Sequence, residues 1–172
     1  MQMPAHYDAT LQLQHPSFVY CVDIHPKDRS QIVVTGCYDR CVRLWSAQSG
    51  VVLGVLSLGS HVNSICFNNS GRRLYCGDGE GIISELSCEV SGEDSASLTM
   101  KRANNQLQGA SACHVKLSPN QKSLHVLCQG NVLAALDLKH FRIATRYARG
   151  TLEDPWTVRV THVSVLFQVS KH

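Results

Sequence analysis

Short runs of alternating apolar and polar residues, separated by turns rich in Gly, Pro, Asn and Asp, occupy most of this chain. The runs at residues 18–24 (FVYCVDI), 31–35 (QIVVT) and 42–45 (VRLW) are rich in the β-branched and aromatic side chains that favour strands. The segments between them, HPKD at 25–28 and GCYDR at 36–40, contain residues that favour turns. The pattern therefore predicts antiparallel hairpins and an all-β fold.

The same arrangement recurs three times along the chain. The units run from His15 to Leu58, from His61 to about Val90, and from Ala110 to Ala148. Each unit has an alternating run, a turn (HPKD, NNSG or SPNQ), a second run, a Gly-containing turn and a third run, and a fourth run follows. Four short strands per unit at a period of about 40 to 50 residues are typical of β-propeller blades.

We therefore expect an incomplete β-propeller of about three four-stranded antiparallel blades, at residues 11–58, 59–103 and 108–150. Residues 1–10 form an N-terminal tail in this interpretation, and residues 151–172 form a tail that does not resemble a fourth unit. Because a propeller closes a ring of roughly 4 to 8 blades, three units are too few. A fragment or a truncated isoform is the simplest explanation.

Three segments around these units carry weaker signals. Residues 11–14 (LQLQ) read as an outer strand, of the kind that completes a preceding blade. The polar stretch from Ser87 to Ala110 reads as a long loop with a weak strand at Leu98 to Arg102. Thr157 to Val169 alternates and then becomes continuously apolar, which favours pairing at an open blade edge or disorder over a specific binding role.

The tryptophan at the end of the second hairpin needs a hydrogen-bond acceptor, because a buried indole N–H is costly when unpaired. Thr35 and Asp39 lie in the strand and the turn before Trp45 and offer such acceptors. With His15 they resemble the buried hydrogen-bonded set of a WD-repeat blade. The resemblance implies that Asp39 is the hub that ties together His15, Thr35 and Trp45.

The later units match this set only in part. In the second unit His61 and Glu80 stand near the expected places, Cys76 replaces the hydroxyl and Leu86 replaces the tryptophan. In the third unit Gly130 occupies the position of the acid and Leu136 that of the tryptophan. We therefore expect a degenerate second set made of His61, Cys76 and Glu80, and none in the third unit.

The resemblance to the WD-repeat family covers roughly residues 10 to 150 and implies a non-enzymatic scaffold that binds other proteins. The sequence is most similar to a family member of the ciliary transition zone, basal body and cell junctions. The similarity lies in the segments HPSFVYCVDIHP, VVTGCYD and GRRLYCGDGEGII. That similarity implies cilium assembly as the process and transition zone components as partners. The alternative is a truncated chain without independent activity, whose open blade edges self-associate.

Composition and charge narrow the classes of function. The chain has 172 residues, 44% of them hydrophobic and 17% charged, with a net charge of +3 and no basic block, which argues against nucleic acid as a partner. No apolar run approaches the roughly 18 residues that a membrane span needs. The polar N-terminus lacks the apolar core of a secretory signal, so we expect an intracellular chain.

Catalytic and metal sites have little support in the sequence. The eight cysteines have no CxxC spacing, so we expect small buried hydrophobes and neither a zinc site nor another cofactor. Asp23 and His25 on one strand, and Cys37 and Cys41 beside His15, are the strongest catalytic candidates, and each has a structural explanation that we favour.

Loop residues are the better candidates for function. Tyr38, Arg40, Arg72 and Arg73 lie in predicted turns at the rims of the blades, where charged and aromatic side chains contact partners. Surface arginines are most often simply solvated, so the sequence assigns none of them as a binding residue.

Overall fold

The computed structural model describes residues 12–27, 31–91, 95–130 and 132–147, and these residues form three four-stranded antiparallel sheets. Blade 1 contains β1 (Val19–Ile24), β2 (Ile32–Cys37), β3 (Cys41–Ser46) and β4 (Val52–Ser57). Blade 2 contains β5 (Val62–Phe67), β6 (Arg73–Asp78), β7 (Ile83–Val90) and β8 (Ala96–Asn104). Blade 3 contains β9 (Ala112–Leu117), β10 (Ser123–Cys128), β11 (Val132–Asp137) and β12 (Arg142–Tyr147).

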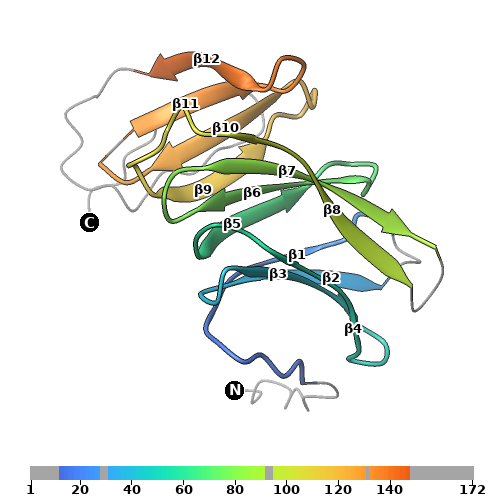
Figure 1. Ribbon diagram of the computed structural model, residues 1–172. Helices are drawn as coiled ribbons and strands as arrows, with labels where there is room; N and C mark the ends of the chain where they lie inside the picture. Colours follow the sequence, from blue (N-terminus) through green and yellow to red (C-terminus); the bar gives the residue numbers. More distant parts are fainter. Residues whose placement is uncertain (1–11, 28–30, 92–94, 131, 148–172) are drawn as a thin grey trace, which may run out of the picture.

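Figure 1 shows the three blades as twisted sheets stacked one after another. Within each blade the strands pair in sequence order, and the first strands β1, β5 and β9 pack next to one another. The predicted all-β incomplete propeller is therefore confirmed.

The blades share one strand register. The hairpin formed by the first two strands of each blade has a register shift at the same position. Next to this shift Gly36 pairs with Cys21, Gly77 with Ser64, and Leu127 with His114. This common register allows residues in different blades to be compared position by position.

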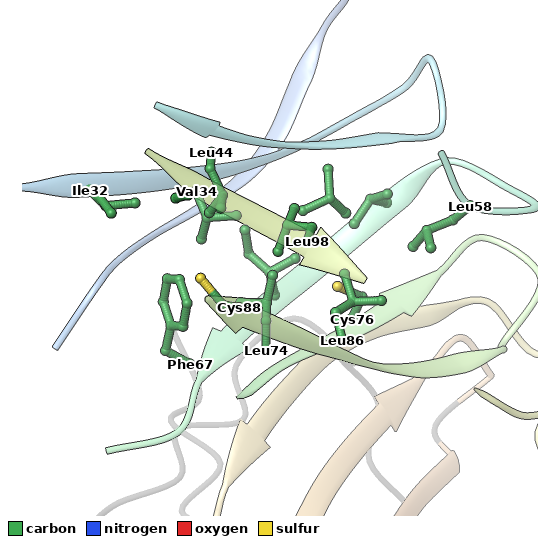
Figure 2. Packing of buried hydrophobic residues seen from close by; sticks show 14 residues of the cluster. Ile32, Val34, Leu44, Leu58, Phe67, Leu74, Cys76, Leu86, Cys88 and Leu98 are labelled. Carbon is green, nitrogen blue, oxygen red and sulfur yellow. The ribbon is translucent and has the colours of Figure 1, made fainter. Parts of the chain in front are cut away.

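Two hydrophobic cores lie between the blades. Figure 2 shows the first, in which side chains of blade 1 face those of blade 2. Its labelled members are Ile32, Val34, Leu44, Leu58, Phe67, Leu74, Cys76, Leu86, Cys88 and Leu98. The second core joins blades 2 and 3 through residues that include Tyr75, Ile83, Val115, Leu124, Val126 and Leu136. Each blade therefore depends on its neighbour to bury a face of its sheet.

Two sequence expectations differ from the structure. The predicted loop after Ser87 is a long hairpin, because β7 continues to Val90 and pairs along its whole length with the nine-residue β8. Ala96 and Leu98 explain why this polar stretch forms a strand, since both are buried in the first core. Residues 12–14 of the predicted outer strand have no strand structure. The tails at 1–10 and 151–172 lie outside the described residues.

The described cysteine side chains mostly lie inside the blades. Cys37, Cys76 and Cys88 are buried free thiols, and Cys21, Cys41 and Cys66 are half-buried ones. Burial raises the pKa of Cys21 and of Cys66 to about 12 and that of Cys88 to about 11. The thiols of Cys21, Cys66 and Cys88 are therefore protonated packing groups at neutral pH. Within the described part of the chain, no helix has the length and apolar character to cross a bilayer.

Candidate functional site

The indole of Trp45 is held by a buried hydrogen bond inside blade 1. Its Nε1–H donates to Oγ1 of Thr35 at 2.9 Å, and both residues are 3% exposed. The register of β2 against β3 sets this contact, because Val33 pairs with Trp45 and brings Thr35 within reach. Thr35 is thus the acceptor of the indole, one of the two that the sequence nominated.

The carboxylate of Asp39 lies in the turn between β2 and β3 and faces Arg43. Arg43 donates from Nη1 to Oδ1 at 3.1 Å and from Nη2 to Oδ2 at 2.5 Å, and the backbone N–H of Cys41 donates to Oδ1 at 3.2 Å. The hydrogen bonds from Arg43 lower the pKa of Asp39. Arg43 therefore binds the carboxylate through two hydrogen bonds, and the role of Asp39 as the hub of His15, Thr35 and Trp45 stays a prediction.

His15 lies against the same cluster from the segment that precedes β1. Its ring centroid is 4.5 Å from that of Trp45, and its Nδ1 is 3.4 Å from Sγ of Cys37. Burial, and then the charge of Arg43, lower the pKa of His15, while burial raises the pKa of Cys37. A neutral imidazole beside a protonated thiol is a packing contact and a poor nucleophile.

The three residues of the predicted second set have different surroundings in blade 2. Cys76 is buried in the first core, Glu80 is exposed, and His61 has its Nδ1 3.3 Å from Oγ of Ser60. The buried acid of this turn is Asp78 instead, whose Oδ1 accepts from the backbone N–H groups of Glu80 at 3.0 Å and of Ile82 at 2.8 Å.

Burial raises the pKa of Asp78, although the two backbone donors oppose that shift. The sequence signal for this residue is the DGEG turn, in which an Asp followed by Gly is placed to bind the amides of its own turn. Sequence reasoning missed Asp78 because it looked for the acid two positions later.

In blade 3 the two predicted replacements occupy matching places in the sheet. Gly130 has a φ of +78° in the turn after β10. Leu136 is fully buried opposite Leu124, as Leu86 lies opposite Leu74 in blade 2. An apolar pair thus stands where blade 1 has its indole.

Three exposed rings and one half-buried ring at the junction of blades 1 and 2 form what we call the aromatic surface: Phe18, Tyr20 and Tyr38, with His61 half-buried among them. Phe18 is 77% exposed, Tyr38 56% and Tyr20 50%. The rings of Tyr20, Tyr38 and His61 form a triangle with centroid separations of 6.0, 5.9 and 5.8 Å. Of these residues the sequence nominated Tyr38 for binding and His61 for the degenerate second set, whereas Phe18 and Tyr20 are not in predicted turns.

Backbone hydrogen bonds hold the aromatic surface in place. The carbonyl of Phe18 accepts from the N–H of Tyr38 at 2.9 Å, and the carbonyl of His61 accepts from the N–H of Gly79 at 2.9 Å. Gly79 leaves room for the imidazole, because a Cβ there would lie 2.0 Å from Cε1 of His61. The rings are therefore presented by strand ends and tight turns.

The three nominated arginines have different surroundings. Arg40 is exposed in the turn next to Tyr38, with a φ of +69°, and Arg72 is exposed at the opposite end of blade 2. Arg73 is occupied, since its Nε lies 3.4 Å from the buried carboxylate of Glu85. Arg102 also pairs with Glu85 and donates from Nη2 to the carbonyl of Leu138 at 2.6 Å, which links blade 2 to blade 3.

The catalytic candidates on β1 have roles in packing. Oδ2 of Asp23 accepts from the backbone N–H of Phe67 at 2.8 Å, which joins the first strands of blades 1 and 2. The buried ring of His25 packs on that of Phe67, with centroids 5.2 Å apart, and fills the space over Gly71. Within the described residues, no three His, Cys, Asp or Glu side chains gather as ligands for a metal ion.

Comparison with known sequences finds repeats of one kind. The model of the WD domain, G-beta repeat, matches residues 8–46 and 52–84. Jouberin of Rattus norvegicus and jouberin of Mus musculus are each 33% identical over 138 residues, which is 74% of this chain and 13% of each relative. Autophagy-related protein 16 of Arabidopsis thaliana is 29% identical over 102 residues, which is 54% of this chain and 20% of that protein. The chain thus spans a small part of these relatives.

Solved structures share the fold at low sequence identity. The β-propeller domain of Cps50 (Swd1) from Myceliophteria thermophila has a TM-score of 0.65 at 14% identity, and covers 76% of this chain and 41% of that one. The structure of U3-55K has a TM-score of 0.65 at 15% identity, and covers 80% of this chain and 41% of that one. The described blades therefore correspond to part of a larger ring in each solved propeller.

Proposed function

Since the chain belongs to the WD-repeat family, we propose that it is a non-enzymatic scaffold that binds other proteins through its aromatic surface. The observation that carries the proposal is the exposure of Phe18, Tyr20 and Tyr38 on the fixed ends of strands.

Aromatic rings of this kind are efficient anchors for a partner. Tyr and Phe bury a large area at a low cost in side-chain entropy, and aromatic residues and Arg are enriched among the residues that dominate binding energy. Both tyrosine rings already pack against His61, which reduces the freedom that they lose when a partner binds. Arg40, exposed beside Tyr38, supplies a charged donor at the rim.

We further propose that the partners belong to the cilium. The similarity to jouberin supports a place at the ciliary transition zone or basal body, a role in cilium assembly, and partners among transition zone components. Cell junctions are a second location consistent with that similarity. Because the chain spans 13% of those relatives, the activity of a whole jouberin is a proposal for this chain.

The test is proximity labelling in ciliated cells with the full chain fused to a biotin ligase. The variant Y20S/Y38S removes two rings, and V51S/M100S is the matched control, because Val51 and Met100 are exposed apolar residues elsewhere in blades 1 and 2. We expect Y20S/Y38S to lose transition zone proteins that the wild type and the control both label. Equal labelling by all three would overturn the role of the aromatic surface.

A second candidate is a truncated chain without independent activity. Val22 and Ile24 on β1 favour it, because they are 62% and 66% exposed on a face that other blades bury. If this candidate holds, the wild type labels chaperones and itself in place of ciliary proteins, and it elutes as an aggregate in size-exclusion chromatography.

A further inference from the structure

Gly36 and Gly77 lie where one blade packs against the next. A Cβ on Gly36 would lie 2.6 Å from Cγ1 of Val62 in β5, and a Cβ on Gly77 would lie 2.9 Å from Cβ of Ala112 in β9. Both distances are shorter than side-chain contacts allow. At each glycine, therefore, the first strand of the following blade leaves no room for a side chain on the second strand of the blade before it.

The corresponding position in blade 3 is a leucine. Gly36 pairs with Cys21, Gly77 with Ser64 and Leu127 with His114, each next to the same irregularity in the sheet. The neighbours of Leu127 on β10, Val126 and Cys128, belong to the core shared with blade 2, so Leu127 points to the opposite face of blade 3. That face is where a following blade would pack.

The residues that pair with Gly36, Gly77 and Leu127 also differ between blade 3 and the other two blades. Sγ of Cys21 lies 3.6 Å from the carbonyl of Val62, and Oγ of Ser64 accepts from the N–H of Val115 at 3.0 Å. These small side chains contact the backbone of the next blade directly. Blade 3 has the bulky and exposed His114 at this position.

A third position differs in its hydrogen-bonding chemistry. Asp23 accepts from the N–H of Phe67, and the thiol of Cys66 is hydrogen-bonded to the backbone of Leu117. The residue of β9 that corresponds to Asp23 and Cys66 is Lys116, which is exposed. Its ammonium group has donors only and offers no acceptor to a backbone N–H.

The open face of blade 1 has the opposite character. Ile65 and Phe67 of β5 are buried against blade 1, and Val115 and Leu117 of β9 pack into the core shared with blade 2. The corresponding residues of β1 are Val22 and Ile24, apolar like these but more than 60% exposed. Blade 1 therefore has the side chains of a blade that follows another.

We propose that the stack has a direction: the open face of blade 1 receives a β-blade of another polypeptide that carries glycine at the Gly36 position, and blade 3 of a second copy does not fit there. Leu127, His114 and Lys116 together block the second copy. Without that block two copies would supply six blades, within the roughly 4 to 8 that close a ring. The proposal does not depend on the aromatic surface.

The test converts blade 3 into a blade of the first type. The variant H114S/K116D/L127G, made in the full chain, gives blade 3 a small residue, a hydrogen-bond acceptor and a glycine at the three positions. Blade 3 of the variant is then the glycine-bearing blade that serves as the probe. Mass is measured by light scattering after size-exclusion chromatography over a range of concentrations. We expect the wild type to remain a monomer and the variant to dimerise at least about tenfold more tightly.

Three further measurements make the result specific. V22D/I24D in the variant background alters exposed residues of β1 and is expected to abolish the dimer. Tagged variant is expected to capture untagged wild type, because the wild type still offers an intact blade 1. Circular dichroism checks folding. If the glycine change prevents the triple variant from folding, H114S/K116D, which changes only exposed residues, takes its place and is expected to dimerise more tightly than the wild type.

Two results would overturn the proposal. One is a wild type that already forms a dimer which V22D/I24D abolishes, since Leu127 would then block nothing. The other is that neither H114S/K116D/L127G nor H114S/K116D, when folded, dimerises more tightly than the wild type, because the three positions would then not decide which blade fits.

Discussion

The first strands of blades 1 and 2 are the same element in opposite surroundings. β1 and β5 have six residues each and pair in the same register with their neighbours, yet Val22 and Ile24 are exposed where Ile65 and Phe67 are buried. The difference comes from what lies beside each strand, since blade 1 covers β5. Strand pairing is thus set within a blade, whereas burial is set by the neighbouring blade.

The interiors of the two blades differ in the same way. Blade 1 buries the polar pair of Trp45 and Thr35, and at those positions blade 2 has Leu86 and Cys76. Blade 2 instead buries the carboxylate of Glu85 between two arginines. One strand framework therefore tolerates a neutral hydrogen bond in one blade and an ionic cluster in the next.

Loss of the ionic cluster should have the largest effect. E85A leaves Arg73 and Arg102 without their shared carboxylate, and we expect it to lower the free energy of unfolding by about 3 kcal/mol, at the lower end for buried ion pairs because both arginines are partly solvated. Urea denaturation measures the change. The isosteric E85Q keeps the packing and one acceptor and should cost less, and equal losses would mean that the charge of Glu85 alone accounts for the effect.

The junction of blades 1 and 2 should be next in sensitivity. G36A places a Cβ against Val62, and overpacking of this kind is expected to destabilise the chain by about 2 kcal/mol. G59A is the control, because a Cβ on Gly59 meets nothing within 4 Å. Thermal melts that do not distinguish the two variants would show that the glycine is not needed at this junction.

The neutral hydrogen bond of blade 1 should contribute less. T35V removes Oγ1 and leaves the buried indole N–H of Trp45 unpaired, for an expected loss of about 1 to 2 kcal/mol in the free energy of unfolding. T35S retains the hydroxyl and should lose less. The matching substitution C76V in blade 2 removes no such acceptor, so a loss as large as that of T35V would contradict the distinction between the blades.

Acidification should produce the smallest effect, through His25 at the same junction. Burial lowers the pKa of His25 below its ordinary value of 6.5, so the stability that this residue contributes is present above pH 6.5 and is lost as the pH falls toward the folded-state pKa. We expect H25Q to flatten the decline of the melting temperature between pH 7 and 5. An unchanged slope would assign the decline to other histidines.

The strands were predictable because the alternating runs and turn residues act locally. The period of 2 and the Gly-containing turns indicated three units of four strands, and the repeat of these units predicted the propeller. The weak strand predicted at Leu98 to Arg102 lies within β8, but the full length of the β7–β8 hairpin was missed because its residues are polar, and the contact of Ala96 and Leu98 with blade 1 explains it. Long-range packing of that kind is not visible in a local pattern.

The candidate site was predictable only in part for the same reason. The proximity of Thr35 and Trp45 follows from hairpin register, which the sequence indicates. The contact of Asp39 with Arg43 depends on a competing donor, and the aromatic surface depends on His61 reaching Tyr20 and Tyr38 across two blades. Contacts between blades therefore mark the limit of the sequence interpretation.

Amide hydrogen exchange followed by NMR tests the central comparison most directly. The N–H groups of Phe67 and Val115 donate to Asp23 and Ser64 of the preceding blade. On β1 the N–H of Ile24 donates to Asp23 of its own strand, and Val22, the counterpart of Val115, has no preceding blade beside it among the described residues. We predict slow exchange at Val115 and fast exchange at Val22. Protection of Val22 equal to that of Val115 would contradict the account, because the face of blade 1 would then be covered.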